Sequence, residues 1–316
     1  MRWQPLAAVA IAAVAAAGCE DPQPLNDAAY TDLNLSPEQN RVRAEENPEL
    51  AARVPEEIAE DGELTVAHNV QPGPPFAMVA TDNSTPIGVE VDQAQLVADK
   101  LGLELDLQAM SWDSWPLKLE TGDIEVAHFN IGINRERLER FDFSTCRGAY
   151  MAFSTATDGP HDSIETIDDV SGLRISVSAG TNQERILLDW NEQLEGEGKE
   201  PAELAYYANG EDMVLAAAAG RVDALFGPHP TATYRESMRD DLKIVGVVNA
   251  GWPDETLVAS TTKRGDGLAP LITQAYNELI DEGLYQEALA RWNLEEEALP
   301  ESETHSLEPY TDVEYD

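Results

Sequence analysis

The feature that most constrains the fold is a regular alternation of strand-like and helix-like segments between residues 63 and 248. Strand-like segments alternate apolar and polar residues, whereas helix-like segments repeat apolar residues every three or four positions. The first half places them at Glu63–His68, Asp92–Leu101, Leu103–Met110, Trp115–Thr121 and Ile124–Phe129. The second half places them at Leu173–Val177, Thr181–Leu194, Leu204–Tyr207, Glu211–Ala219, Val222–Phe226 and Lys243–Val248. This order predicts an α/β fold with largely parallel sheets.

The length of the chain fits two units of this kind. At 316 residues it exceeds one ordinary domain and can bury a sizeable core, so we expect two lobes. Two prolines stand near predicted helix starts, where the backbone N–H that proline lacks would have no partner within the helix. Pro116 opens one such helix, and the run Gly-Pro-His-Pro at 227–230 precedes another.

Both ends of the chain depart from this pattern. Residues 1–18 combine one arginine with an apolar run that is too short to span a bilayer, which predicts a signal peptide. The segment AAGC that ends at Cys19 resembles the lipid-attachment site of bacterial lipoproteins, and plain secretion after Ala17 is the alternative. Residues 19–60 and 295–316 are acidic and poor in apolar periodicity, so we expect a flexible tether and a solvated tail.

The charge of the chain excludes one class of partner. With 20 Lys and Arg against 60 Asp and Glu, the formal net charge is −40, which repels the phosphates of nucleic acids. An acidic excess of this size keeps a protein soluble and monomeric at high salt, so it indicates a salt-rich habitat. An ordinary acidic surface on a secreted protein is the alternative reading.

The sequence offers no motif for a metal or a cofactor. Cys19 and Cys146 are the only cysteines, so we expect no disulfide in the mature chain and no site built on paired cysteines. Cys146 fits a buried structural residue better than a catalytic thiol. The five histidines lack the spacing of a zinc site, and the chain has neither a nucleotide-binding glycine loop nor a Gly-x-Ser-x-Gly elbow.

Two short stretches favour anion binding. Arg135, Arg137 and Arg140 fall within six positions, although basic residues are scarce in this chain. The stretch SAGTNQE at 178–184 follows a predicted strand and opens a predicted helix, with Thr181 or Asn182 placed to cap it. Free N–H groups at a helix start attract anions, although a simple N-cap explains the stretch equally well when it is taken alone.

Seven segments occur in an order and spacing that together point to one family. They are GELTVAHNVQPGPPF, IGVEVDQAQLVADKLG, WDSWPLKLETGDIE, INRERLERFDFS, SAGTNQE, AAGRVDALFG and DEGLYQEALARW. Between Gly62 and Trp292 the chain resembles the extracytoplasmic solute-binding proteins of ABC importers for polar amino acids. The resemblance implies a two-lobed, periplasmic-binding-protein-like (flytrap) fold, with two mixed sheets flanked by helices and joined by two crossing strands.

The resemblance also implies a division of the chain. Residues 61–150 and 251–294 belong to the first lobe, and residues 151–250 form the second. The crossings are expected near Tyr150–Thr155 and Val247–Thr256, and the ligand is expected between the lobes.

In this family an arginine clamps the α-carboxylate of the ligand, and the matching residue is Arg137. Arginine gives a carboxylate two parallel hydrogen bonds, which lysine cannot do. The glycine–threonine turn is implied to close on the same carboxylate, and Trp112 matches the aromatic residue beside the ligand. Arg135 and Arg140 are left as surface partners of acids. The full predicted set is Phe76, Trp112, Asn130, Gly132, Arg137, Gly180, Thr181, Asn182, Gln183, Pro228 and His229.

Two departures from the family pattern concern the ligand amine. Gly132 stands where the family often has Ser or Thr, and Gly-Pro-His at 227–229 replaces an Asp that pairs with the ammonium. Either another acid, such as Glu90 or Asp92, takes this role, or the ligand lacks an ordinary α-ammonium group.

The resemblance therefore implies a lipid-anchored, extracytoplasmic binding protein that hands a small carboxylate-bearing solute to an ABC permease. An amino acid or a zwitterionic compatible solute fits this description. Two alternatives stay open. One is an enzyme similar to cyclohexadienyl dehydratase, for which His229 and Glu90 are the available acid and base, and the other is a protein that presents ligand to a separate sensor.

Overall fold

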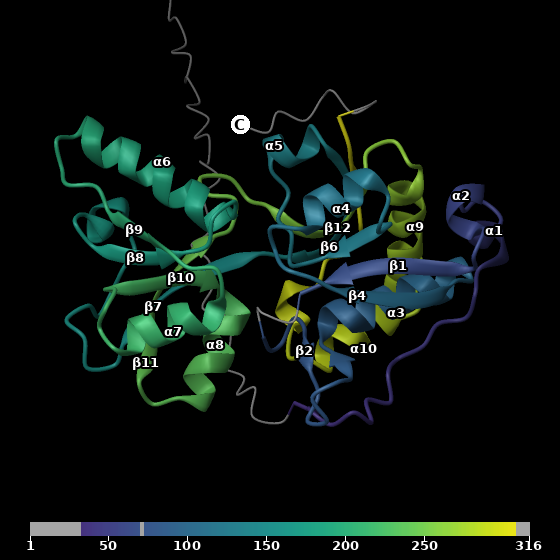
Figure 1. Ribbon diagram of the computed structural model, residues 1–316, viewed down its shortest axis with the longest axis horizontal. Helices are drawn as coiled ribbons and strands as arrows, with labels where there is room; N and C mark the ends of the chain where they lie inside the picture. The colour runs from purple at the N-terminus through teal and green to yellow at the C-terminus, as the bar shows by residue number, and fades with distance from the viewer. Residues whose placement is uncertain (1–32, 70–72, 308–316) are drawn as a thin grey trace, which may run out of the picture.

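A computed structural model describes residues 33–69 and 73–307 of the protein (Figure 1). The described residues form two lobes, each built on a mixed β-sheet flanked by helices. The predicted α/β, two-lobed fold is therefore confirmed. Each predicted strand or helix is present, with ends within three residues of the predicted ones.

The first lobe contains a six-stranded sheet with the order β13-β6-β12-β5-β1-β4. β1 is parallel to β4 and β5, whereas β12 is antiparallel to β5 and β6. The strands are β1 (Glu63–His68), β4 (Glu104–Ala109), β5 (Val126–His128), β6 (Phe141–Gly148), β12 (Leu257–Lys263) and β13 (Thr304–His305), and a separate ribbon comprises β2 (Met78–Val79) and β3 (Pro86–Ile87).

The helices of this lobe pack on the sheet and on one another. Pro116 lies in the first turn of α4, and Gly122, with a φ of 78°, ends it in the left-handed region that glycine tolerates. The helices are α1 (Pro48–Ala51), α2 (Glu56–Ala59), α3 (Val89–Leu101), α4 (Trp115–Thr121), α5 (Arg135–Leu138), α9 (Leu268–Asp281), α10 (Leu284–Ala290) and the short 3₁₀ turn η3 (Glu295–Glu297).

The second lobe contains a five-stranded sheet with the order β11-β7-β10-β8-β9. β8 is parallel to β9 and β10, whereas β7 is antiparallel to β10 and β11. The strands are β7 (Tyr150–Ala156), β8 (Arg174–Val177), β9 (Glu203–Tyr206), β10 (Ala224–Pro228) and β11 (Leu242–Asn249). The helices are η2 (Ile167–Val170), α6 (Asn182–Gly196), α7 (Gly210–Ala218) and α8 (His229–Met238).

The chain passes between the two sheets twice. The first passage lies between Gly148, which ends β6, and Tyr150, which begins β7. The second runs between the end of β11 at Asn249 and the start of β12 at Leu257. Every strand of the second sheet therefore lies between these passages, while the first sheet takes strands from both sides of them.

Residues 33–60, which we call the strap, lie against the first lobe. The expectation of a flexible tether over residues 19–60 is wrong for this segment, because Val42, Leu50, Val54 and Ile58 are buried in the core of the lobe. Burial of these apolar side chains stabilises an ordered segment despite its acidic composition. Residues 19–32 lie outside the described residues, as do the predicted signal peptide and Cys19.

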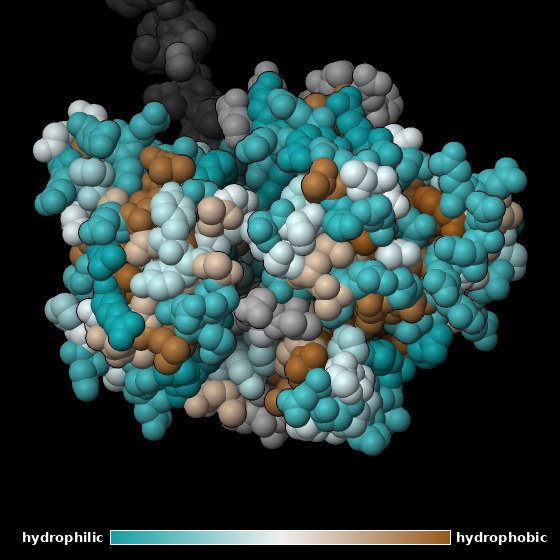
Figure 2. Space-filling model, in the orientation of Figure 1, coloured by the Kyte–Doolittle hydropathy of each residue, from teal (hydrophilic) through white to brown (hydrophobic). Residues whose placement is uncertain are grey.

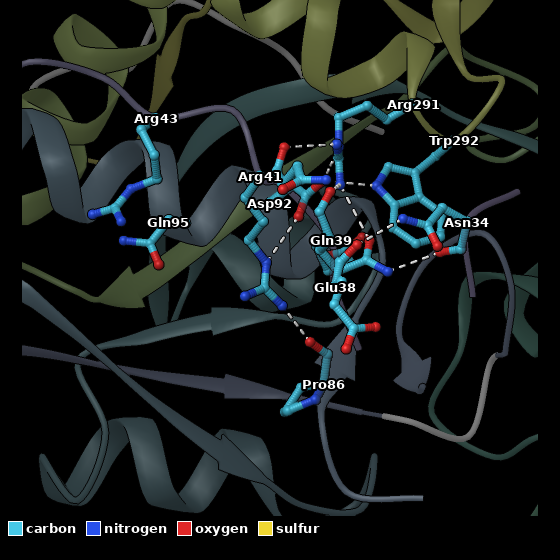
Figure 3. Close-up of polar contacts among 12 residues, drawn as sticks. Asn34, Glu38, Gln39, Arg41, Arg43, Pro86, Asp92, Gln95, Arg291 and Trp292 are labelled. Atoms are coloured by element: carbon cyan, nitrogen blue, oxygen red, sulfur yellow. Dashed lines mark hydrogen bonds and ion pairs between the residues drawn. The ribbon is translucent and has the colours of Figure 1, made fainter. Parts of the chain in front are cut away.

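A buried carboxylate fixes the strap to the rest of the lobe. Asp92 of α3 accepts hydrogen bonds from Arg41 Nε at 3.1 Å, Arg291 Nε at 2.8 Å and Trp292 Nε1 at 2.9 Å (Figure 3). Arg291 also donates to the backbone oxygen of Gln39 at 2.9 Å. Two guanidinium groups and an indole thus satisfy a carboxylate that has no contact with water.

The segment after α10 is also part of the lobe. The expected solvated tail is wrong for residues 295–307, because β13 pairs with β6 and Glu297 is buried. The Glu297 carboxylate and that of Glu90 both bind the fully buried guanidinium of Arg147. Residues 308–316 lie outside the described residues.

The surface and the core agree with the composition. Hydrophilic residues cover most of the face shown in Figure 2, as expected for a chain so rich in Asp and Glu.

Cys146 is buried as predicted, and this burial raises the pKa of its thiol to about 12. Among residues 33–69 and 73–307, no helix has the length and apolar character needed to cross a membrane.

Candidate functional site

A cavity of about 530 Å³ lies between the two lobes and is lined by residues of both. Gly180 lines a larger neighbouring part of the cleft, of about 1010 Å³, which shares Trp112, Arg137 and Thr181 with the cavity. The structure thus brings most of the predicted set together. Eight predicted residues line the cavity, namely Trp112, Asn130, Gly132, Arg137, Thr181, Asn182, Gln183 and Pro228.

Of the three predicted residues that do not line the cavity, Gly180 lines the neighbouring part of the cleft, whereas Phe76 and His229 line neither part. Phe76 is buried in the first lobe, where its ring lies 4.6 Å from the guanidinium carbon of Arg147. His229 is the first residue of α8 and is buried in the second lobe, where its Nε2 lies 3.4 Å from the hydroxyl of Thr233. Neither side chain is placed to contact a ligand in the cavity.

Arg137 is held at the edge of the first lobe by a short capped helix. Asn134 caps α5 by accepting the Arg137 N–H at 2.9 Å. The guanidinium, only 8% exposed as a residue, donates to the Gly132 oxygen at 2.6 Å and the Gly180 oxygen at 3.0 Å. It also lies 5.2 Å from the centre of the Trp112 ring. Desolvation lowers the pKa of Arg137 to about 10, so the group stays charged at neutral pH.

The start of α6 in the second lobe is the predicted glycine–threonine turn. Of the two predicted candidates, Thr181 is the N-cap, and its hydroxyl accepts the Glu184 N–H at 3.2 Å while donating to the Ser178 oxygen at 2.7 Å. The Gly180 N–H donates to the carboxylate of Glu184. A ligand carboxylate that used the Gly180 N–H would therefore compete with the side chain of Glu184.

Direct contacts join the lobes at this point. Asn134 Nδ2 donates to Asn182 Oδ1 at 2.9 Å, and Asn182 Nδ2 donates to the Ala250 oxygen at 3.2 Å. A Cβ atom built on Gly132 would lie 2.6 Å from Asn182 Nδ2. A side chain at position 132 would therefore displace the amide of Asn182 from its present contacts.

The two acids proposed to replace the missing amine partner do not line the cavity. Glu90 is buried beside Arg147, and Asp92 is buried among Arg41, Arg291 and Trp292. The expectation that either of them meets the ligand is therefore wrong, because both are already paired with cations inside the first lobe. Among the described residues that line the cavity, Asp113 is the one carboxylate.

The sequence reasoning also missed several cavity residues. Asn69 directly follows β1 and Tyr207 directly follows β9, and both line the cavity. Ligands of open α/β sheets bind beyond the carboxyl ends of the strands, so the position of these residues was a usable signal. Thr231 and Arg235 line the cavity from α8, and the sequence carried no comparable signal for them.

The other two arginines of the cluster lie outside the cavity. Arg140 pairs with Glu120 at 2.7 Å on the surface, as predicted. Arg135 is exposed on α5. All three clustered arginines line the larger part of the cleft, and Arg137 is the one of them that also lines the cavity.

The sequence of this chain is similar to those of known solute-binding proteins. Residues 64–295 match the sequence profile of the bacterial extracellular solute-binding proteins, family 3. The arginine-binding protein ArgT of Corynebacterium glutamicum is 30% identical over 257 residues, which cover 81% of this chain and 82% of ArgT.

Solved structures show the same architecture. An amino acid ABC transporter substrate-binding protein of Streptococcus pneumoniae, bound to L-arginine, superposes with a TM-score of 0.65 at 26% identity, covering 75% of this chain and 96% of that one. An ancestral amino acid-binding protein, described as a precursor of cyclohexadienyl dehydratase, gives a TM-score of 0.64 at 20% identity, covering 75% and 97%. The second likeness concerns the fold alone.

Proposed function

The chain belongs to the bacterial extracellular solute-binding proteins of family 3, and from this we propose that it captures a small carboxylate-bearing amino acid or derivative and delivers it to an ABC permease. Amino-acid binding for ABC transport is the common function of its relatives. The identity of the solute and its contacts with the residues above are our proposal.

The position of Arg137 at the cavity is the main support for this proposal. Arg137 is a charged, buried guanidinium at a cavity between two lobes, and its neighbours there include carbonyl oxygens and an indole ring but no carboxylate within ion-pair distance among the described residues. An arginine fork binds a carboxylate through two charge-assisted hydrogen bonds. A ligand that reached both Arg137 and the Thr181 turn would favour the closed arrangement of the lobes over the open one.

The test is a binding screen of the purified protein at high salt by thermal shift and calorimetry. A ligand that binds only the folded state raises the melting temperature as its concentration exceeds its Kd. We expect stabilisation by an amino acid or a close derivative. Esters that mask the α-carboxylate should have no effect, and equal binding of acid and ester would contradict the proposal.

No specific observation favours an enzyme. The acid and base considered for a dehydratase, Glu90 and His229, do not line the cavity, and Glu90 is paired with Arg147. We therefore propose binding without turnover. Incubation with each bound ligand, followed by mass spectrometry of the supernatant, should return the ligand unchanged.

We propose further that the protein acts as a monomer outside the cytoplasm, held at the membrane by a lipid on Cys19. This part of the proposal depends on the sequence of the N-terminus and on the extracytoplasmic role of the family. Mass spectrometry of the N-terminal peptide of the native protein is the direct test. A diacylglycerol adduct on Cys19 is the expected result, and an unmodified N-terminus at Gly18 would contradict it.

A further inference from the structure

A second arginine, Arg235, lines the cavity from the other lobe. Arg235 lies on α8, whereas Arg137 lies on α5. In Figure 1, α8 belongs to the second lobe and is near the bottom of the view, and α5 belongs to the first lobe and is near the top. Arg137 also lines the larger neighbouring part of the cleft, which Arg235 does not reach. Both arginines therefore line the cavity, and Arg137 lines the neighbouring part of the cleft as well.

Arg235 has no direct counter-ion within the part of the chain that the structure describes. It forms no ion pair and no hydrogen bond there, and Glu211 acts on it only through a longer-range charge interaction. Burial lowers the pKa of Arg235, which reflects the cost of holding this charge away from water. Arg239, at the end of the same helix, instead forms two 2.8 Å bonds with Asp241.

An independent observation lies one helical turn earlier. Thr231 is 2% exposed and lines the cavity, yet its Oγ1 is buried without a hydrogen-bond partner among the described residues. Residues four positions apart share one face of a helix, so Thr231 and Arg235 face the cavity together. A buried hydroxyl without a partner is unfavourable, and a ligand oxygen would satisfy it.

Building on the proposed function, we propose that Thr231 and Arg235 form a subsite for a second carboxylate at the far end of the ligand. Arg137 would bind the first carboxylate, and the hydroxyl and guanidinium on α8 would both donate to the second. The ligand class is thus an amino acid with an acidic side chain, or a related dicarboxylate.

The charges of the cavity support this class. Two arginines face a single carboxylate, that of Asp113, so a ligand with one net negative charge completes the balance. Asp113 is available to an ammonium group, while Asn69 and Asn209 are neutral. A cationic side chain, such as that of the ligand named for ArgT, would instead face Arg235 with no acid beside it.

The decisive experiment compares L-glutamate with L-glutamine by calorimetry on the purified protein, because they differ in charge at the side-chain end while their shapes are nearly the same. L-arginine and glutarate complete the panel. We expect L-glutamate to bind at least about tenfold more tightly than L-glutamine. Arg235→Gln should weaken glutamate binding on the order of a hundredfold and leave glutamine binding unchanged.

Two further variants complete the design. Thr231→Val keeps the shape of the side chain and removes the hydroxyl, so it should weaken glutamate binding by a smaller factor than Arg235→Gln. Arg239→Gln removes a charge from the same helix outside the cavity and serves as the matched control. Equal loss in the Arg239→Gln and Arg235→Gln variants would indicate a general charge effect and overturn the subsite.

The outcomes separate this inference from the proposed function. Tight binding of L-glutamine or L-arginine, with the same affinity in the Arg235→Gln variant, would overturn the acidic subsite and leave the proposal of amino-acid binding intact. Binding of glutarate alone, lost in Arg235→Gln, would support the subsite and contradict the amino-acid proposal. If neither L-glutamate nor glutarate binds, the subsite is overturned.

Discussion

Arg137 of the first lobe donates a hydrogen bond to the carbonyl oxygen of Gly180 in the second lobe at 3.0 Å. The same guanidinium donates to Gly132 of its own lobe at 2.6 Å. One side chain therefore bridges the cleft at the point where we propose that the ligand carboxylate binds. Under our proposal, ligand binding and closure of the lobes would be coupled through Arg137.

Arg137→Lys should weaken binding of a carboxylate ligand by at least about tenfold, because lysine keeps the charge but loses the planar fork. Arg137→Ala should weaken it further while leaving the fold intact. Calorimetry gives the affinities, and circular dichroism checks the fold. Arg140→Ala is the control, since Arg140 pairs with Glu120 on the surface. Unchanged affinity in Arg137→Lys would contradict bidentate binding.

Arg147→Met should destabilise the protein by about 3–5 kcal/mol, because it leaves the carboxylates of Glu90 and Glu297 buried without a cation. Urea denaturation measures the change in the free energy of unfolding. Burial raises the pKa of Glu297 and Arg147 opposes this rise, so the loss should be larger at high pH, where the Glu297 carboxyl ionises.

A compensated variant provides the control for Arg147. Combining Arg147→Met with Glu90→Gln and Glu297→Gln removes all three charges and should recover most of the lost stability. If the triple variant is as unstable as Arg147→Met, packing rather than unpaired charge is the cause.

Removing the strap should lower the melting temperature by several degrees. A chain that begins at residue 61 loses the buried Val42, Leu50, Val54 and Ile58 and leaves Asp92 without Arg41, whereas a chain that begins at residue 33 keeps all of them. Differential scanning calorimetry of the two chains gives the comparison. Arg43→Ala in the longer chain should have a smaller effect, because the Arg43 side chain is 65% exposed and Asp99 keeps hydrogen bonds from the Ala44 N–H and the Gln95 amide.

Glu125 should make stability fall as the pH rises. Desolvation raises the pKa of Glu125 in the folded state to about 7, with the Thr65 N–H opposing and Asp61, Asp266 and Asp106 reinforcing the rise. Between the ordinary value of 4.5 and about 7, the folded state holds a proton that the unfolded state has lost, so this group's contribution decreases across that window.

The variant Glu125→Gln tests this contribution directly. It keeps an oxygen to accept the Thr65 N–H and cannot ionise, so the loss of stability between pH 5 and 7 should be smaller than in the unaltered protein. Added salt should reduce the loss in the unaltered protein by screening the neighbouring acids. Glu63→Gln, at an exposed position of β1, is the matched control. Identical pH profiles for the two variants would contradict the assignment.

Local signals in the sequence predicted local structure well. Pro116 and Gly122 mark the start and end of α4, and Thr181 caps α6. Where a helix begins and ends depends on backbone geometry within a few residues, so short stretches of sequence suffice to predict it. The place of Arg137 in the cavity agrees with the expectation drawn from the resemblance of the segment INRERLERFDFS, while its role toward a ligand stays a prediction.

The features that depend on distant partners could not be predicted in this way. Glu90 and Asp92 lie on α3, as the helical pattern indicates. No neighbouring residue in the sequence predicts the distant arginines with which they pair inside the lobe. The strap looked solvated because its composition is acidic, although Leu50, Val54 and Ile58 recur every four positions. Thr231 and Arg235 lie on one face of α8, but their place at the cavity depends on how the helix packs in the fold.

The contacts of Asp92 also bear on the order in which the protein folds. Arg41 precedes it by 51 positions, while Arg291 and Trp292 follow it by 199 and 200. The second sheet draws its strands from one continuous stretch, so the second lobe can form as soon as residues 150–249 are available. The first lobe must wait for residues 291–305, because such distant contacts are slow to close, Arg291 holds the strap and Asp92, and β13 pairs with β6. A chain that emerges N-terminus first therefore keeps its first lobe open until residues 291–305 have emerged.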